Sequence, residues 1–392
     1  MAKYQYMPLN DNVEEMFIGP FGSSLKNDSF VDESDAFCMV YEQKHAIKKT
    51  MTVETRYVNR EKYEELKRFN IKGGDIIVSC RGTIGETYIV PDDAPLGIMH
   101  PSIMKIRLKP GVYNKQYFNL LLRNYLKQHE DEANGSGIKM AISAKALGAT
   151  LFPVPNMAEQ NQIASTFNQV EELISLRKEQ LAKLDQLVKS RFIELFGGIS
   201  DSKRYPYKAV KELTDVISGG TPSREVNEYW EGGTIPWVKT TELQNNIITE
   251  IDEHITKAGL DNSSAKLVPV GTVLIAMYGQ GKTRGMTGYL GVEACTNQAC
   301  ACILPSDSIN QKFLWQFFVL SYDNLRDMAK GGNQPNLNGN IIKNYPVLYP
   351  PMELQEQFEA FVEQTDKSKL VIQQSLDKLE LLKKSLMQEY FG

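Results

Sequence analysis

The sequence contains no long apolar run and few histidines. Nothing in its 392 residues is long and apolar enough to cross a bilayer, and the first residues, Met-Ala-Lys-Tyr-Gln-Tyr, show no apolar signal region. We therefore expect no membrane anchor. The histidines are isolated from one another, so their spacing suggests no Ser/His/Asp catalytic set. They are His45, His100, His129 and His254.

Cysteine is also scarce. Five cysteines in a chain of this length favour free thiols in a reducing compartment, so we expect a cytoplasmic protein. Cys295, Cys300 and Cys302 are close in sequence, but no histidine lies near them. Cys300 and Cys302 alternate as residues on a strand do. We therefore predict no metal site at these cysteines.

An excess of positive charge is missing as well. The net charge is −4, with 42% apolar and 23% charged residues. These values are ordinary for a soluble globular chain, and the length allows two or more domains. The charge balance alone does not indicate a polyanionic partner. A nucleic-acid-binding protein of this composition would have to concentrate its basic residues locally.

What the chain does contain is an internal repeat of half its length. Phe391-Gly392 repeats Phe196-Gly197, which lies 195 residues earlier, and this separation holds back through the preceding segment without a gap. Solenoid repeats are only about 20–50 residues long. We infer a duplicated two-part unit, and we expect its ligand to have two halves. The matching pairs are Pro155 and Pro350, Met157 and Met352, Gln160 and Gln355, Gln162 and Gln357, Gln169 and Gln364, Leu181 and Leu376, Lys183 and Lys378, Leu184 and Leu379, Leu187 and Leu382, Lys189 and Lys384, Ser190 and Ser385, and Glu194 and Glu389.

Each copy of the repeat contains a segment with apolar residues at alternating steps of four and three, interrupted by a few polar ones. This spacing is typical of a coiled-coil seam. In the first copy the seam residues are Ile163, Phe167, Val170, Ile174, Leu181, Leu184, Val188 and Leu195. In the second copy they are Phe358, Val362, Ile372, Leu376, Leu379, Leu386 and Tyr390.

The ends of both helices are marked in the sequence. Asn156 can cap the first helix, with Glu159 completing a capping box, and Gly197-Gly198 can end it. Pro350-Pro351 suits the start of the second. Each helix would have roughly 35 residues and a length of ~50 Å. We expect the two helices to pair with each other; the alternatives are packing on neighbouring globular segments or on a second protein.

A globular segment of about 150 residues precedes each helix. Both segments are rich in short β-like runs and glycine turns. They diverge more than the helices, but several landmarks correspond. These are residues 3–6 and 204–207, residues 19–24 and 219–223, residues 74–78 and 271–275, Gly82 and Gly279, and Gly137 and Gly332. We interpret the helices as a common frame that carries two variable heads.

The polar loops of both heads carry side chains that suit DNA. Arginine and lysine match guanine edges and phosphates, and asparagine and glutamine match adenine edges. Such side chains also occur on ordinary soluble surfaces, so residue types alone leave DNA contact open. The candidates in the first head are Lys44, His45, Lys48, Lys49, Arg81, Lys139 and Lys145. Those in the second are Lys239, Thr240, Thr241, Gln280, Lys282, Arg284, Asn297, Gln298, Asn333 and Gln334.

One motif resembles a phosphate-binding loop. Gly281-Lys282-Thr283 follows a predicted strand that ends near Ile275. However, Ala276 replaces the leading glycine that this loop requires. Residues 284–288 are a poor helix start, so the helix dipole that would hold the phosphates is missing. The equivalent turn at residues 79–85 has no Gly-Lys-Thr. We therefore do not predict nucleotide binding.

No catalytic signature is convincing elsewhere. Tyr349-Pro350-Pro351-Met352 lacks the amide and the closing aromatic ring of an Asn-Pro-Pro-Tyr methyltransferase motif. No glycine-rich strand–helix entry suits S-adenosylmethionine, and no cluster of acids with lysine suggests a nuclease. We predict that the chain has no active site of its own.

Taken in order, these features resemble the DNA-specificity subunit of type I restriction–modification systems. The resemblance covers essentially the whole chain, as head, helix, head and helix. The chain departs from the family pattern at Ala158-Glu159 and Glu353-Leu354, where a pair of acids is common, and at Gly19-Pro20-Phe21-Gly22, which replaces Gly-Gly-Thr-Pro. The most specific motifs are Ser218-Gly219-Gly220-Thr221-Pro222-Ser223, Tyr229-Trp230, Ile235-Pro236-Trp237, Met277-Tyr278-Gly279, and the helix entries at residues 155–160 and 350–355.

The resemblance implies an α+β fold. Two α/β target-recognition domains in a pseudo-twofold arrangement would be joined by two long helices that form an antiparallel coiled coil. The domains would be residues 1–155 and 200–349, and the helices residues 156–199 and 350–392. Each domain would read one half of a split DNA target, and the helices would fix the unread spacer.

The resemblance also implies partners. The chain would bind double-stranded DNA and two modification subunits, which would bring S-adenosylmethionine and adenine methyl transfer. Two restriction subunits would bring ATP, Mg and cleavage. The chain itself would bind no cofactor and no metal. Two other classes stay open: a structural adaptor that binds proteins rather than DNA, and an enzyme built around Gly281-Lys282-Thr283.

Overall fold

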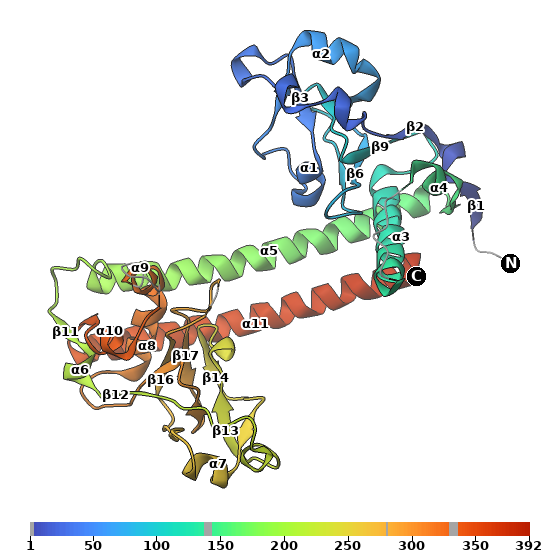
Figure 1. The fold of residues 1–392 in the computed structure, drawn as a ribbon. Coiled ribbons are helices and arrows are strands. Elements are labelled where there is room, and N and C mark those ends of the chain that lie inside the picture. The colour runs from blue at the N-terminus through green and yellow to red at the C-terminus, as the bar shows by residue number, and fades with distance from the viewer. Residues whose placement is uncertain (1–3, 137–142, 280, 329–335) are drawn as a thin grey trace. The chain divides into compact units, whose positions relative to one another are not determined.

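The computed structural model describes residues 4–136, 143–279, 281–328 and 336–392 (Figure 1). The chain divides into two compact units, one formed by Met1–Leu176 with Leu376–Gly392 and the other by Arg177–Ser375. Each unit contains one globular head and parts of both long helices, α5 (Met157–Phe196) and α11 (Met352–Phe391). The fold is α+β, as expected, but each long helix has 40 residues rather than roughly 35.

The described residues of the first head form three sheets, two of them with four strands. One four-stranded sheet runs β2 (Val13–Ile18), β9 (Ile103–Leu108), β6 (Ile76–Ser79) and β7 (Thr87–Ile89), all antiparallel. The second runs β4 (Tyr57–Val58), β3 (Cys38–Tyr41), β8 (Gly97–Met99) and β5 (Asn70–Ile71), with β3 and β8 parallel. The third pairs β1 (Gln5–Pro8) with β10 (Leu151–Val154). The α-helices are α1 (Gln43–Lys48), α2 (Arg60–Glu65), α3 (Lys115–Ser136) and α4 (Ala144–Ala149). The 3-10 turns are η1 (Leu9–Asn12), η2 (Gly22–Ser24), η3 (Asn27–Ser29), η4 (Glu33–Asp35) and η5 (Lys67–Phe69).

In its described residues, the head of the second unit repeats this plan with one more strand in its first sheet and one fewer in its second. Its largest sheet runs β12 (Val216–Ser218), β19 (Cys300–Ile303), β16 (Val273–Ala276), β17 (Thr287–Leu290) and β14 (Asn246–Ile248). The next runs β15 (His254–Ile255), β13 (Ile235–Val238) and β18 (Cys295–Thr296), with β13 and β18 parallel. β11 (Tyr207–Ala209) pairs with β20 (Pro346–Leu348). The remaining elements are α6 (Val210–Leu213), α7 (Lys257–Asp261), α8 (Gln311–Leu320), α9 (Tyr322–Met328), α10 (Gly339–Lys343), η6 (Asn227–Tyr229) and η7 (Thr240–Glu242).

Both faces of each large sheet are buried. In β6, Ile76 and Val78 face the apolar cluster that contains α3, whereas Ile77 faces the cluster beneath β3. In β16, Val273 and Ile275 face the apolar cluster that contains α8, whereas Leu274 and Ala276 face a second cluster on the other side of the sheet. Successive side chains of a strand point to opposite faces. A strand buried on both faces therefore needs the continuous apolar run that the sequence shows here.

Within each unit, α5 and α11 pack against each other in opposite directions. In the first unit the ring of Phe167 lies 6.4 Å from that of Tyr390, and one turn later Glu171 pairs with Lys383 at 2.6 Å, earlier in α11. In the second unit Lys369 pairs with Asp185 at 2.7 Å. Farther along α5, Phe192 contacts Phe358, again at an earlier position of α11, with ring centroids 5.5 Å apart. The helix segments of each unit are therefore antiparallel.

The seam residues of both helices are buried or half-buried in the described structure. In α5, Ile163, Phe167 and Val170 are buried, as is Val188, whereas Leu195 is only half-buried. The predicted seam did not include Phe192 and Phe196, but the structure buries both side chains fully. These two rings belong to the core of the second head. The helix thus buries a wider face than its partner helix alone requires, because it also packs on the head.

Two of the predicted helix-end residues, Asn156 and Gly197, have the expected roles at the ends of α5. The Oδ1 atom of Asn156 accepts a hydrogen bond from the amide of Glu159 at 2.9 Å, as expected of an N-cap. The carboxylate of Glu159 accepts one from the hydroxyl of Tyr4 at 2.6 Å. Gly197 adopts a φ of 86°, and its amide bonds to the carbonyl of Ile193. Glycine is the residue that tolerates this left-handed conformation, so it ends the helix.

A buried glutamine joins each long helix to its head. Gln160 accepts a hydrogen bond from the amide of Asn114 at 2.8 Å and donates to the carbonyls of Val112 and Pro155. The matching Gln355 accepts from the amide of Asn310 at 2.9 Å and donates to the carbonyl of Pro350 at 2.8 Å. Both glutamines are almost completely buried. This explains physically why the repeat keeps glutamine at this position.

Gln355→Leu is expected to lower the free energy of unfolding of the second unit by about 1–3 kcal/mol, because it leaves two backbone groups without partners. The three tryptophans of the chain, Trp230, Trp237 and Trp315, all lie in this unit. Urea unfolding followed by tryptophan fluorescence therefore measures the effect. Gln357→Leu is the control, because Gln357 is exposed on the same helix. Equal midpoints for the two variants would refute the proposed role of Gln355.

Among the residues that the structure describes, no helix combines the length and the apolar character that crossing a membrane requires.

Candidate functional site

A parallel strand pair in each head brings two loops to one edge. In the first head, β3 and β8 end at Tyr41 and Met99, and the amide of His100 bonds to the carbonyl of Tyr41 at 2.9 Å. In the second head, the amide of Asn297 bonds to the carbonyl of Val238 at 3.1 Å. His100 and Asn297 are 197 residues apart, as are Tyr41 and Val238. The same junction therefore occurs in both heads.

Two further segments join this edge through repeated backbone bonds. The turn after β6 is held by a bond from the amide of Cys80 to the carbonyl of Ser102, and the turn after β16 by one from Met277 to Ala299, both at 2.8 Å. A glycine-containing loop from earlier in the sequence joins the same edge in each head. In the first head, the amide of Gly19 bonds to the carbonyl of Ile103. We name these surfaces the first loop face (residues 19–24, 42–49, 80–86 and 100–102) and the second loop face (residues 219–223, 239–242, 277–279, 281–286 and 297–299).

The glycines of the two loops permit close backbone packing. A Cβ atom at Gly19 would lie 2.2 Å from the carbonyl oxygen of His100. A Cβ atom at Gly220 would lie 2.3 Å from the carbonyl carbon of Ser264. Neither space admits a side chain. By contrast, a Cβ atom at Gly22 would meet nothing within 4 Å. Gly19 and Gly220 are thus required by packing.

A carboxylate organises the cations of the first loop face. The carboxylate of Glu42 forms ion pairs with Arg56 and, at 2.8 Å, with Lys44. Burial would raise the pKa of Glu42, but these hydrogen bonds outweigh it and hold the pKa below its usual range. Burial also lowers the pKa of His100. The carboxylate of Glu42 opposes this shift, and the guanidinium of Arg56 adds to it. This edge therefore favours a neutral imidazole and a charged carboxylate.

The exposed cations of this face are Lys48, Lys49 and Arg81. Lys49 lies 3.5 Å from Glu86, whereas Lys48 and Arg81 form no ion pair with any residue that the structure describes. His45, predicted to lie in a contact loop, is instead fully buried. The amide of Glu42 donates to its Nδ1 atom at 3.0 Å, so this histidine caps the start of α1. Sequence reasoning could not separate this capping role from a surface role.

The second loop face holds its predicted lysine in place. Lys239 pairs with Glu253 at 2.7 Å, and Arg224 pairs with the same carboxylate at 2.6 Å. The hydrogen bond from Lys239 lowers the pKa of Glu253. This interaction is therefore present at neutral pH and is lost in acid, as the pH falls through the lowered pKa. The ion pair with Glu253 thus fixes the side chain of Lys239, which the residue type alone did not indicate. Thr240 and Thr241 begin η7 beside it.

Aromatic residues fix the glycine loop of this face. The indole of Trp237 donates to the carbonyl of Gly220 at 2.9 Å, and that of Trp230 donates to the carbonyl of Ser223 at 3.0 Å. The guanidinium of Arg224 lies over the ring of Trp230, 3.6 Å from its centroid. The glycine and tryptophan motifs thus act together to hold the loop.

The comparisons with known proteins agree with this duplicated plan. The profile of the family described as "Type I restriction modification DNA specificity domain" matches residues 13–186 and 203–381. The chain belongs to this family. The two matches correspond to the two head-and-helix repeats.

Several curated relatives are specificity subunits of type I restriction enzymes. The MjaIX subunit of Methanocaldococcus jannaschii is 30% identical over 162 residues, which are 39% of this chain and 36% of the relative. The EcoR124I/EcoR124II subunit of Escherichia coli is 23% identical over 163 residues, 41% of this chain and 40% of the relative. The MjaVIII subunit of M. jannaschii is 21% identical over 346 residues, 82% and 79% of the two chains. The match to the first two relatives therefore spans well under half of their length.

Solved structures share the fold along the whole chain. A type I restriction–modification S subunit from M. genitalium has a TM-score of 0.59 at 14% identity and covers 100% of this chain and 97% of its own. A chain from a study of complex assembly and conformational transition of the type I R-M system has a TM-score of 0.60 at 16% identity, with 100% and 98% covered. At this identity the similarity shows the fold alone.

The Gly281-Lys282-Thr283 turn is not a phosphate-binding loop. It connects β16 to the antiparallel strand β17, so no helix follows it. The amide of Gly285 bonds to the carbonyl of Ala276 and closes the turn. The hydroxyl of Tyr322 donates to the carbonyl of Lys282 at 2.7 Å. This part of the face presents the exposed side chain of Lys282 and the half-buried side chain of Arg284.

The cysteines are buried free thiols, and burial raises the pKa of Cys295 and of Cys302 to about 11. Protonated thiols are poor ligands and nucleophiles. In the described ranges, no group of three or more histidine, cysteine or acidic residues could hold a metal ion.

Four predicted contact residues lie outside the residues that the structure describes. They are Lys139, Gln280, Asn333 and Gln334. Lys145 is exposed on α4, which is not one of the segments of the first loop face, while Asn297 and the exposed Gln298 belong to the second loop face.

Two candidates on the first loop face escaped the sequence reasoning. Phe21 is 86% exposed in the glycine loop. An aromatic side chain between Pro20 and Gly22 in a predicted glycine loop was the available signal. Arg56 lies just before β4 and joins the face by its ion pair with Glu42. Nothing in the sequence around Arg56 indicated this ion pair.

Proposed function

We propose that this chain is the DNA-recognition subunit of a type I restriction–modification complex, in which each loop face reads one half of a split target. The observation that carries the proposal is a repeated backbone with unlike side chains. Equivalent backbone hydrogen bonds hold the amides of Cys80 and Met277 in the two heads. The next residue, however, is Arg81 in the first head and Tyr278 in the second. A common scaffold with different side chains suits two half-targets of different sequence.

The charges of the first loop face support contact with DNA. Arg81 and Lys48 are exposed cations without an ion-pair partner in the described part of the chain. A guanidinium can bond two acceptors on a guanine edge, and a lysine suits phosphates. The net charge of −4 is compatible with this proposal because partner subunits can supply further contacts with the phosphates.

The long helices fit the role of a spacer. A helix of 40 residues is roughly 60 Å long, more than one ~34 Å turn of B-DNA. In this proposal, α5 and α11 fix the number of unread base pairs between the two half-targets.

The helices also offer docking surface for the modification subunits. Leu381 is 68% exposed in the first unit, and Leu370 and Val371 are 60% and 66% exposed in the second. Exposed apolar side chains on a helix are typical of protein contacts. Two modification subunits would bring S-adenosylmethionine and methylate a flipped adenine, and two restriction subunits would bring ATP, Mg and cleavage. This chain would contribute recognition rather than catalysis.

Selection of bound sequences from random duplexes tests the proposal. The chain is purified with its modification subunits, and bound DNA is sequenced after several rounds. We expect a motif of two fixed halves around a spacer of constant length, with affinity that falls steeply as salt rises. Recovery of random sequence, together with an intact complex, would favour the adaptor alternative instead.

Arg81→Gln is expected to relax one base position of one half-target. The loss of a bidentate contact costs about 1–3 kcal/mol, so discrimination at that position should fall about 10- to 100-fold. Competition binding with single-base variants of the target measures this loss. Lys282→Gln is the matched change on the second loop face, and it should act only on the other half-target. If both variants altered the same half, the assignment of one half to each head would be wrong.

A further inference from the structure

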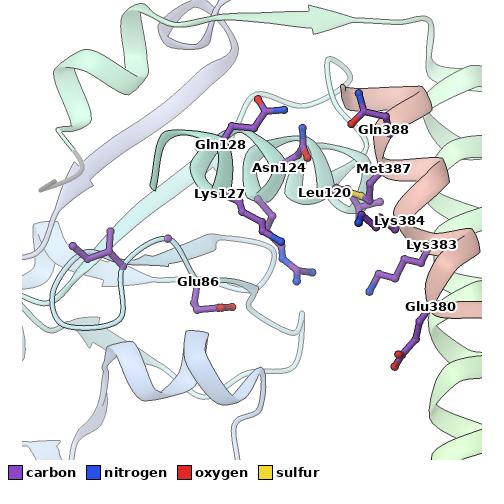
Figure 2. Close-up of a pocket in the computed structure, with 13 residues that line it drawn as sticks. Glu86, Leu120, Asn124, Lys127, Gln128, Glu380, Lys383, Lys384, Met387 and Gln388 are labelled. Carbon is purple, nitrogen blue, oxygen red and sulfur yellow. The ribbon is translucent and has the colours of Figure 1, made fainter. Parts of the chain in front are cut away.

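A basic cleft of about 720 Å³ lies in the first unit (Figure 2). Its walls are α3, the turn between β6 and β7, and the last turns of α11. In Figure 2, Lys127 extends from α3 and Lys383 from α11 toward the space between these elements. All the lining residues belong to this unit. The cleft adjoins the first loop face, because Glu86 and the turn before it line both.

The cleft contains more positive charge than its neighbours neutralise. Four cations line it, Arg123, Lys127, Lys383 and Lys384, together with the carboxylates of Glu86 and Glu380. Lys383 is paired with Glu171 at 2.6 Å, and Glu86 lies 3.5 Å from Lys49. The other three cations form no ion pair with any residue in the described ranges. Like charges held close together repel one another, so the cluster suits a bound anion.

The duplicated fold repeats the cleft's cations only in part, because Lys384 corresponds to Lys189 of the second unit. Asn114 and Asn310 both cap the helices that follow them, α3 and α8, through Oδ1, which aligns the two helices residue by residue. In that alignment, Arg123 corresponds to Val319, which packs against the core of the second unit. Along the long helices, Met387 of the cleft corresponds to Phe192, which is fully buried in the same core. Arg123 is therefore particular to the first unit, whereas Lys384 has a lysine counterpart in the second.

We infer that this cleft binds the phosphate backbone of DNA next to the half-target that the first loop face reads. The inference rests on the proposed function. Residues 84–86 belong both to the first loop face and to the wall of the cleft, so a duplex bound at this turn would extend along the cleft. Three cations within one cleft match a run of phosphates, which carry one charge per ~3.4 Å along each strand. Contacts to phosphates position the duplex and do not read its sequence.

The test is the salt dependence of DNA binding by the complex with its modification subunits. The variant is Arg123→Gln/Lys127→Gln/Lys384→Gln, and the probe is a labelled duplex with the selected target, measured by fluorescence anisotropy from low to moderate salt. We expect the slope of log K against log salt to decrease by about 2–3, and the affinity at 0.15 M salt to fall about 10- to 100-fold. The preference for the target over a duplex with a scrambled first half should stay within about twofold.

Two control variants keep this test decisive. Lys67→Gln/Lys109→Gln/Lys115→Gln removes the same charge from exposed lysines that do not line the cleft, so it should retain most of the slope. Lys127→Arg/Lys384→Arg preserves the charge and should bind as the unmodified chain does. A wild-type slope in the glutamine variant would overturn the inference while leaving sequence recognition intact. If the unmodified complex failed to discriminate target from scrambled DNA, the proposed function itself would fail.

Discussion

Phe358→Ala is expected to lower the free energy of unfolding of the second unit by about 3–5 kcal/mol. Phe358 is fully buried where α5, α8 and α11 meet. Its ring centroid lies 5.5 Å from that of Phe192 and 5.7 Å from that of Phe196. Truncation removes these contacts and leaves a cavity that the surrounding helices cannot close. Because the tryptophans of the chain all lie in this unit, urea unfolding followed by their fluorescence measures the loss directly.

Leu370→Ala is the control for this prediction. Leu370 lies on the same helix but is 60% exposed, so its truncation should change the stability by less than about 0.5 kcal/mol. Phe358→Ala should also weaken the recognition of the second half-target before that of the first. An unfolding midpoint equal to that of Leu370→Ala would show that the helix is not part of the core of this head.

Gly19→Ala is expected to abolish recognition of the first half-target and to spare the second. A Cβ atom at this position would lie 2.2 Å from the carbonyl oxygen of His100 and 2.7 Å from its carbonyl carbon. Backbone atoms cannot move aside as the end of a flexible side chain can, so the loop must separate from the strand end. We expect a cost of about 3 kcal/mol or more in the first head, and at least about a 100-fold loss of first-half discrimination. Competition binding with duplexes scrambled in one half measures both effects.

Gly22→Ala supplies a control three residues away. A Cβ atom at Gly22 would meet nothing within 4 Å, so this variant should bind as the unmodified chain does. Equal effects of the two alanines would mean that the loop responds to any substitution rather than to the contact with His100. Loss of both half-targets with Gly19→Ala would contradict the independence of the two heads.

The helical frame was predictable because its signal is local. Steps of four and three residues identify the seam, and Asn156 and Gly197 mark the ends of α5 without any long-range information. The wider face of α5 was not predictable. Phe192 and Phe196 fall beside the seam positions, and their burial depends on α8, which lies more than a hundred residues later in the sequence.

The loop faces were only partly predictable because they depend on strand pairing. The sequence indicated the polar loops, but it could not show that β3 lies parallel to β8 and so brings residues 42–49 beside His100. Nor could it show that Lys44 and Lys239 are held by Glu42 and Glu253. The basic cleft was least predictable, because Arg123 and Lys384 come from helices at distant points of the chain.

Mapping of DNA methylation in whole genomes tests the central claim most directly. Cells that carry this chain with its modification subunit are compared with cells that lack only this chain. The account predicts a split motif, with adenine methylation in both halves, that disappears with the chain. It also predicts that Gly19→Ala changes one half of that motif and Gly22→Ala changes neither. Identical methylation with and without the chain would contradict its role as the recognition subunit.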